Sequence, residues 1–157
     1  MNIIVEGIFT MAYNTKPDNS QRINACNSRI AQCEANIRNL QSEIVVLQKR
    51  RGSLADGRAD EAQRRSQFIN RADEEITRMS RAERIDNIKM AWGYAENIRQ
   101  VLRGSKFQNA EYAHDQIITE IDQAIKKIDE EMYSKNRQIS SYQSEINSLR
   151  WEISTLQ

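Results

Sequence analysis

The sequence predicts an all-α protein, built as an elongated antiparallel helical hairpin or coiled coil. Helix breakers are scarce, with five glycines and one proline in 157 residues. Two long stretches repeat apolar residues in alternating steps of three and four, the spacing of a coiled-coil stripe. Charged residues make up 29% of the chain and its mean hydropathy is -0.76. A chain this polar can bury one stripe of each helix, but not a thick globular core.

The first 17 residues are expected to form a disordered leader, with a single helical domain over 18–157. The opening "MNIIVEGIFTMAYNTKP" has too short an apolar run to span a membrane. It also lacks the basic start and small-residue cleavage site of a secretory signal. Met11 opens a more typical polar leader than Met1, so either methionine could be the true start.

The first helix is predicted over about 18–51. Asp18 and Gln21 have the spacing of a capping box, which indicates a helix start after Pro17. A stripe of apolar residues then follows without interruption over four heptads, and these residues should form one side of a buried seam: Ile23, Cys26, Ile30, Cys33, Ile37, Leu40, Ile44 and Leu47.

The two cysteines both fall at d positions of this stripe, where a thiol packs as a small apolar group. Cys26 and Cys33 are seven residues apart, which is about 10 Å along a helix and too far for a disulfide between them. A zinc site would need two further ligands, and the chain offers only His114 besides. Packing in the seam is the favoured interpretation, and a disulfide between two copies of the chain is the alternative.

Gly52 and Gly57 interrupt the stripe and predict a kink or short turn over residues 52–57. Folding back at this kink would make a three-helix arrangement, and the sequence leaves that open. A second helix is predicted over about 58–103, with oppositely charged residues four apart supporting its surface: Asp60 with Arg64, Glu61 with Arg65, and Glu74 with Arg78.

The main reversal of the chain is predicted at Gly104–Asn109, where glycine and serine precede Phe107. Trp92–Gly93 is the competing position. The third helix, over about 109–156, contains neither glycine nor proline. Lys135 and Tyr142 place polar groups in its seam, either to set register or because the lysine head reaches solvent. The seam of this helix is Ile118, Ile121, Ile125, Ile128, Met132, Lys135, Ile139, Tyr142, Ile146, Leu149, Ile153 and Leu156.

No catalytic, cofactor or metal site is predicted. The chain has no glycine-rich phosphate loop, no nucleophile motif and a single histidine. Glu111 and His114 form one Glu-x-x-His step, but a di-iron helical bundle needs two such steps. We therefore expect a protein that is not an enzyme and that has no cofactor.

Charge gives little support for binding nucleic acid. The formal net charge is +1; residues 1–104 hold 17 Lys and Arg against 13 Asp and Glu, and residues 105–157 hold 6 against 9. Acidic residues are interleaved with the arginines of the second helix, which leaves a weak positive field. These arginines are Arg58, Arg64, Arg65, Arg71, Arg78, Arg81 and Arg84.

The segment Phe107-Gln108-Asn109, between two long helices, resembles the turn of WXG-type helical hairpins, with F-x-N in place of W-x-G. The longer layout, with "IDQAIKKIDEEMYSKNRQISSYQSEI" after the turn, resembles the small helical companion proteins of LXG toxins in bacterial type VII secretion. The final "SLRWEISTLQ" lacks the Y-x-x-x-D/E export tail of many such substrates. The resemblance implies a cytoplasmic companion, with export alongside a partner by a non-classical route as the alternative.

The resemblance implies a non-enzymatic adaptor or targeting partner that packs against the helical N-terminal region of a type VII secreted effector. One alternative is a self-associating coiled-coil scaffold; another, weaker one is an accessory that binds nucleic acid. We expect another helical protein or a second copy of the chain as partner, with neither nucleic-acid binding nor membrane insertion. Candidate partner-binding residues are Trp92, Phe107, Ile125, Ile128, Ile139, Tyr142, Ile146 and Trp151.

Overall fold

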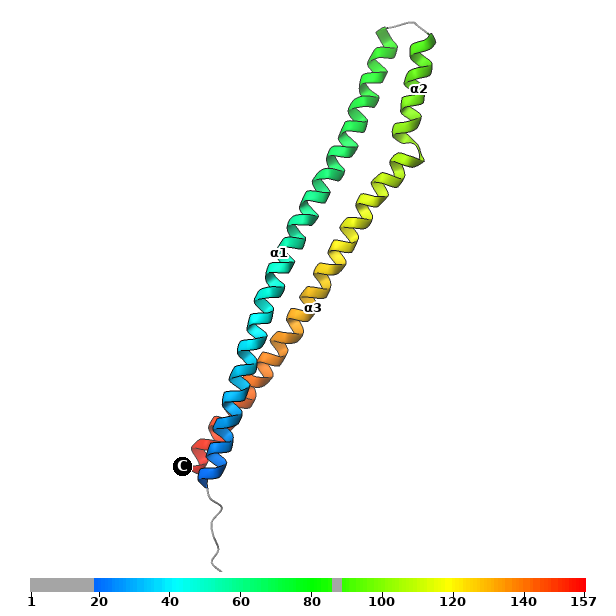
Figure 1. Cartoon of the computed structure of the whole chain (residues 1–157). Coiled ribbons are helices and arrows are strands. Elements are labelled where there is room, and N and C mark those ends of the chain that lie inside the picture. The colour runs from blue at the N-terminus through cyan, green and yellow to red at the C-terminus, as the bar shows by residue number, and fades with distance from the viewer. Residues whose placement is uncertain (1–18, 86–88) are drawn as a thin grey trace, which may run out of the picture. The chain divides into compact units, whose positions relative to one another are not determined.

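The computed structural model describes residues 19–85 and 89–157, and it contains three helices (Figure 1). They are α1 (Asn19–Ile85), α2 (Lys89–Arg103) and α3 (Ser105–Leu156). Of the described residues, all but Gly104 and Gln157 are helical, which confirms the predicted all-α class. The start of α1 agrees with the predicted start to one residue. The expected leader and Asp18 lie outside the described residues.

The chain divides into two compact units. The first contains the described part of Met1–Asn39 with Gln138–Gln157, and the second is Leu40–Arg137. In the first unit, the start of α1 runs antiparallel to the end of α3. Asn19 Nδ2 donates to the Leu156 carbonyl oxygen at 3.1 Å, and Arg22 Nη2 lies 2.7 Å from Glu152 Oε1.

The seam of the first unit is filled by the predicted residues. Cys33 is fully buried, Cys26 is 7% exposed and Ile146 is 6% exposed. Ion pairs flank the seam on both sides, with Arg29 bound to Glu145 on one side and Arg150 bound to Glu34 on the other. An apolar stripe bordered by charge pairs is the usual cross-section of an antiparallel coiled coil.

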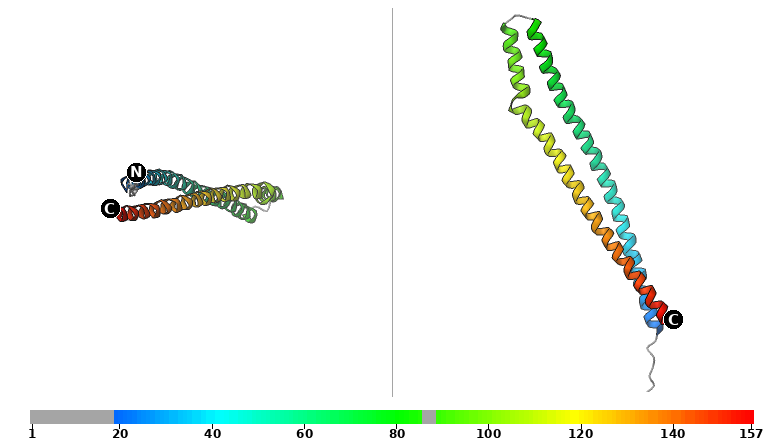
Figure 2. Two further views of the ribbon diagram at one scale, coloured as in Figure 1. Left: turned by 90° about the horizontal axis from the view of Figure 1, so that it is seen from below. Right: turned by 180° about the vertical axis from the view of Figure 1, so that it is seen from behind.

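The second unit is an antiparallel hairpin in which α2 and the start of α3 lie along α1 (Figure 1; Figure 2, right). Leu47, Ala72, Ala95 and Ile128 are its most buried apolar side chains. Arg99 Nη2 of α2 donates to Ser80 Oγ of α1 at 3.2 Å. Beyond α2, the start of α3 packs against α1, with Arg65 of α1 bound to Asp115 of α3.

The helix α1 continues through Gly52 and Gly57, so the short turn offered for residues 52–57 is wrong, and the chain does not fold back there. The three-helix alternative that depended on it is wrong as well. Glycine inside a helix costs about 1 kcal/mol relative to alanine, which weakens a helix without ending it. Here the glycines lie among side chains that bind α3, namely Arg51 to Asp129 and Arg58 to Asp122.

Both predicted positions of the reversal are also wrong. Trp92 and Gly93 lie inside α2, which already runs antiparallel to α1. Gly104 is a break between two helices that both run antiparallel to α1 (Figure 1). Asn109 is helical, and no described residue has a positive φ. The Phe107–Asn109 segment is therefore the first turn of α3.

A close backbone approach explains the glycine at this break. A Cβ atom at position 104 would lie 2.3 Å from the Gln100 carbonyl oxygen, which is closer than any real Cβ contact. The Gly104 carbonyl accepts a hydrogen bond from Gln108 N at 3.1 Å, which connects the break to α3. Glycine thus allows α2 to end and α3 to begin within one residue.

Candidate functional site

The predicted seam residues of α3 lie inside the two units, against α1. Ile128 is 6% exposed in the second unit, and Ile139 and Ile146 are 9% and 6% exposed in the first. Ile125 and Tyr142 are half-buried. A partner could reach these side chains only if α1 and α3 separated.

The predicted aromatic anchors lie differently. Trp92 is 57% exposed and Trp151 is 70% exposed. Trp151 borders a shallow surface hollow of about 730 Å³ in the first unit, together with Arg22 and Thr155. Phe107 is half-buried, and its ring stacks on Phe68 of α1 with centroids 4.7 Å apart and planes 15° apart.

Further large apolar side chains, which the sequence did not single out as partner contacts, are exposed on all three helices. The sequence pattern does not show which apolar residues face outward, because that depends on where the other helix of the hairpin lies. These residues are Val45, Val46, Tyr94, Val101, Tyr112, Ile117 and Tyr133.

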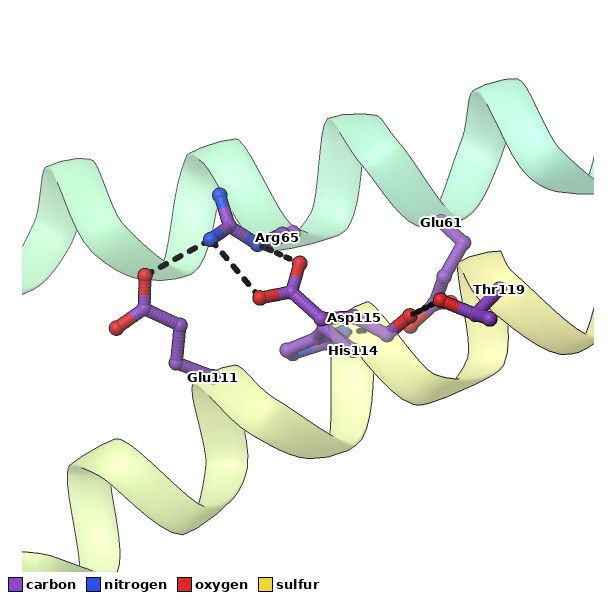
Figure 3. Close-up of polar contacts among 6 residues, drawn as sticks. All are labelled: Glu61, Arg65, Glu111, His114, Asp115 and Thr119. Atoms are coloured by element: carbon purple, nitrogen blue, oxygen red, sulfur yellow. Dashed lines mark hydrogen bonds and ion pairs between the residues drawn. The ribbon is translucent and has the colours of Figure 1, made fainter.

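A polar cluster joins α1 and α3 in the second unit (Figure 3). Arg65 Nη2 donates to Glu111 Oε1 at 2.9 Å, and Arg65 Nε lies 2.7 Å from Asp115 Oδ1. His114 Nδ1 is 2.5 Å from Glu61 Oε1, and the Glu61 side chain is only 12% exposed. Each of the three carboxylates therefore has a basic partner on the opposite helix.

This cluster differs from the predicted use of its residues. Arg65 was expected to pair with Glu61 along α1; it pairs across to α3 instead. The Glu-x-x-His step does not bring its two side chains to one point, because Glu111 binds Arg65 while His114 binds Glu61. Among the described residues, no three His, Cys, Asp or Glu side chains are placed to hold a metal ion.

Three Arg–Asp pairs form a ladder at seven-residue spacing on both helices of the second unit. A signal for it is present in the sequence, because each set of three residues keeps one heptad phase. Arg51 and Arg58 donate hydrogen bonds to Asp129 and Asp122, and these bonds raise the pKa of each guanidinium group. The pairs are Arg51 with Asp129, Arg58 with Asp122 and Arg65 with Asp115.

Lys135, the charged residue predicted in the seam, bridges the two helices of the second unit. Its Nζ lies 2.5 Å from Glu43 Oε2 on α1 and 3.3 Å from Glu131 Oε1 on α3, and its side chain is 16% exposed. The hydrogen bond to Glu43 raises the pKa of Lys135. Because the largely buried Lys135 amine needs the Glu43 carboxylate on α1, this pair favours one register of α3 along α1.

The cysteines pack in the seam of the first unit, as predicted, and both thiols are free. The same three-residue arrangement occurs twice, one heptad apart: Arg22, Cys26 and Glu152, then Arg29, Cys33 and Glu145. Burial raises the pKa of each thiol, and the adjacent glutamate raises it further. The Arg29 hydrogen bond lowers the pKa of Glu145.

The break at Gly104 adjoins an apolar hollow in the second unit, which we call the α2–α3 hollow. Its volume is about 370 Å³. Sequence reasoning did not find it, because its wall combines α1 with both helices that follow the reversal. Its lining residues are Arg64, Gln67, Phe68, Arg71, Ala72, Glu75, Leu102 and Phe107.

Comparison with protein families, with characterised proteins and with solved structures finds no match to this chain. The resemblance to WXG-type hairpins and to companions of LXG toxins stays a prediction. Of α1, α2 and α3, over the residues described, none combines the length and the apolar content needed to cross a membrane.

Proposed function

We propose that this protein is a non-enzymatic helical adaptor that packs against the helical N-terminal region of a type VII secreted effector. The observation that carries the proposal is the contrast between a filled seam and exposed tryptophans. Ile128 and Ile146 are each 6% exposed within their units, whereas Trp92 is 57% exposed and Trp151 is 70% exposed. Tryptophan is among the residues that contribute most to interface energies.

A binding role is supported by the closed seam of each unit, which leaves only the outer helix faces for a partner. Apolar seams bordered by cross-helix ion pairs close each unit without a second chain. Aromatic side chains, tryptophan included, are enriched at protein–protein interfaces relative to the rest of the surface. The adaptor would use its outer helix faces, because the inner ones are occupied.

The class of partner comes from the resemblance to companions of LXG toxins. Long helices with exposed aromatic residues suit docking of helix against helix, in which anchors recur every three or four residues. The adaptor would meet its effector in the cytoplasm and would either remain there or leave the cell with it.

Co-expression with the products of neighbouring genes tests this function. The tagged chain is captured, and the mass of the eluted species is measured by light scattering. We expect a stoichiometric complex with a larger protein that begins with helices. The double variant Trp92→Ala/Trp151→Ala should lower its yield several-fold, while the exposed control Gln108→Ala should not.

A homo-oligomer of the chain with no companion protein would contradict the adaptor and favour the self-associating scaffold. Ile128→Asp is unsuitable for this test, because a carboxylate at a site 6% exposed would unfold the second unit. The tryptophan variants change exposed side chains, so their melting temperatures should stay close to that of the wild type.

A further inference from the structure

The α2–α3 hollow has an apolar wall from three helices of the second unit. Phe68 and Ala72 of α1, Leu102 of α2 and Phe107 of α3 supply it. Ala72 is buried, and the other three are half-buried, so their outer faces remain open to a ligand. A hollow of about 370 Å³ with this lining suits an apolar side chain.

Two exposed arginines of α1 stand at the edge of this wall, one heptad apart. Neither Arg64 nor Arg71 has an ion pair or a hydrogen-bond partner within residues 19–85 and 89–157. The carboxylate that shares the lining, Glu75, is bound to Arg78 at 2.9 Å. Arg103 is the last residue of α2 and Lys106 lies in the first turn of α3, so both are next in sequence to lining residues of the hollow. The lining of the hollow is therefore mainly apolar, and its charged groups are two arginines and one carboxylate that already has a partner.

In the first unit, two arginines of α1 with the same spacing bind two glutamates of α3. Arg22 and Arg29 occupy the same heptad position of α1 as Arg64 and Arg71. There, Glu152 lies 2.7 Å from Arg22 and Glu145 lies 2.5 Å from Arg29, so two glutamates seven residues apart on α3 bind two arginines seven residues apart on α1. Each glutamate is followed by an isoleucine, Ile146 or Ile153, that packs in the seam.

We infer that the α2–α3 hollow is the docking site for an acidic amphipathic helix of a partner protein. The helix presents two carboxylates seven residues apart to Arg64 and Arg71, and it places an apolar side chain from between them against Phe68, Leu102 and Phe107. This inference rests on the proposed adaptor function and names the surface that the adaptor uses.

The spacing of the arginines favours a helix over other acidic ligands. Seven residues of α1 rise about 10 Å, which equals the rise between carboxylates seven residues apart on a second helix. An apolar residue three or four positions after the first carboxylate lies on the same face of that helix. Charges that flank an apolar contact in this way determine which helices pair.

The test is a selection from a displayed library of random 16-residue peptides against the immobilised full chain. We expect enriched sequences to carry Asp or Glu seven residues apart with a large apolar residue between them. Fluorescence anisotropy of the best synthetic peptide then gives its Kd. Arg64→Glu/Arg71→Glu should raise that Kd at least tenfold, and added salt should weaken binding to the wild type.

A matched control is the double variant Lys49→Glu/Arg50→Glu. It reverses the same amount of charge on exposed residues of α1, at least 14 residues from Arg64 or about 20 Å along the helix. This control should bind the peptide as the wild type does. All variants are checked for helix content and melting temperature first.

Several outcomes would overturn the inference: no enrichment, enrichment of sequences without acidic residues, or a Kd that Arg64→Glu/Arg71→Glu leaves unchanged. Binding of a small apolar anion to the wild type, with no binding of any peptide, would overturn it as well. Failure of this docking site can be distinguished from failure of the adaptor function. If the co-expressed complex forms and survives Arg64→Glu/Arg71→Glu, the adaptor stands and this docking site is wrong.

Discussion

Arg58 of α1 binds Asp122 of α3, with Nε 2.5 Å from Oδ1, directly beside Gly57, the last residue of the segment where a kink or turn was predicted. Both side chains are about half-exposed, and a single pair of this kind adds little stability. The Arg51–Asp129 and Arg65–Asp115 pairs repeat the contact one heptad away on either side. Together they hold α1 along α3 through its weakest helical segment.

Gly52→Ala and Gly57→Ala should each stabilise the protein by about 1 kcal/mol, because alanine restricts the unfolded chain and favours helix. A Cβ atom at either position has no neighbour within 4 Å, so no steric cost offsets this gain. Urea denaturation followed by circular dichroism measures the change. If residues 52–57 needed glycine for a turn, both variants would be less stable than the wild type.

Gly104→Ala should have the opposite effect. Its Cβ atom would lie 2.3 Å from the Gln100 carbonyl oxygen, a backbone atom that cannot move without displacing α2. We expect a lower denaturation midpoint, and also a change in the environment of Phe107 at the start of α3. Gly93→Ala, at a position with no neighbour within 4 Å, is the matched control and should not destabilise. Equal midpoints for both variants would contradict the close approach at Gly104.

The stacked rings of Phe68 and Phe107 should contribute more than the sum of their separate burial. A double-mutant cycle with leucine at both positions should give a coupling of about 0.5–1.5 kcal/mol. Leucine keeps most of the apolar volume but removes the ring contact seen at 4.7 Å. Urea denaturation of the four proteins supplies the data. Additive effects would show that the rings pack independently.

The cysteine thiols should react slowly in the folded protein. Burial and the adjacent Glu145 raise the pKa of Cys33, so its thiolate fraction at pH 8 is below that of an exposed cysteine. Labelling with 5,5′-dithiobis(2-nitrobenzoate) should be slow in buffer and fast in urea. In a cysteine-free background, Gln108→Cys at an exposed position of α3 provides the rapid control. Rapid labelling of Cys33 in buffer would contradict its place in the seam.

Acid should weaken the first unit partly through Glu145. Hydrogen bonding to Arg29 lowers the pKa of Glu145 in the folded chain below its value in the unfolded chain. A depressed pKa adds stability that is present above the unfolded pKa and is lost as the pH falls through the folded pKa. We therefore expect the urea concentration at the midpoint to decrease once the pH is below about 4.3, the usual pKa of glutamate. The decrease should continue at lower pH until Glu145 is protonated in the folded chain.

Arg29→Gln removes the main cause of that shift. Its midpoint should be lower than that of the wild type at neutral pH, and its decrease on acidification should be shallower. Lys126→Gln, which changes a lysine 78% exposed, is the control and should follow the wild-type slope. Parallel curves for wild type and Arg29→Gln would mean that other carboxylates cause the acid response.

The two seams were predictable because a helical stripe is a local property. The seam residues from Ile23 to Leu47 and from Ile118 to Leu156 keep the heptad spacing without a gap, and each of these seam residues is buried or half-buried. The start of α1 and the ends of α2 and α3 were predicted to within one residue for the same reason. In each case, a capping residue, a glycine or the end of the pattern lies at the boundary.

The glycines misled the prediction because their effect depends on what surrounds them. Gly52 and Gly57 weaken a helix by an amount that the Arg–Asp ladder and the apolar packing of α1 overcome. Gly104 separates two helices because a backbone carbonyl leaves no room for a side chain. The three positions look alike to any rule based on residue type. Gly104 is distinguished by a local backbone contact with the carbonyl of Gln100, which a Cβ atom at position 52 or 57 does not meet.

The sequence alone determined that this chain is helical, where its long helices bury a stripe, and that two cysteines lie in that stripe. These properties follow from the order of residues along one helix. Tertiary structure decided where the chain reverses, which carboxylate each arginine binds, and which apolar side chains stay exposed. Those depend on residues far apart in the chain: Arg65 could bind Glu61 on its own helix, and only the position of α3 places Glu111 and Asp115 closer.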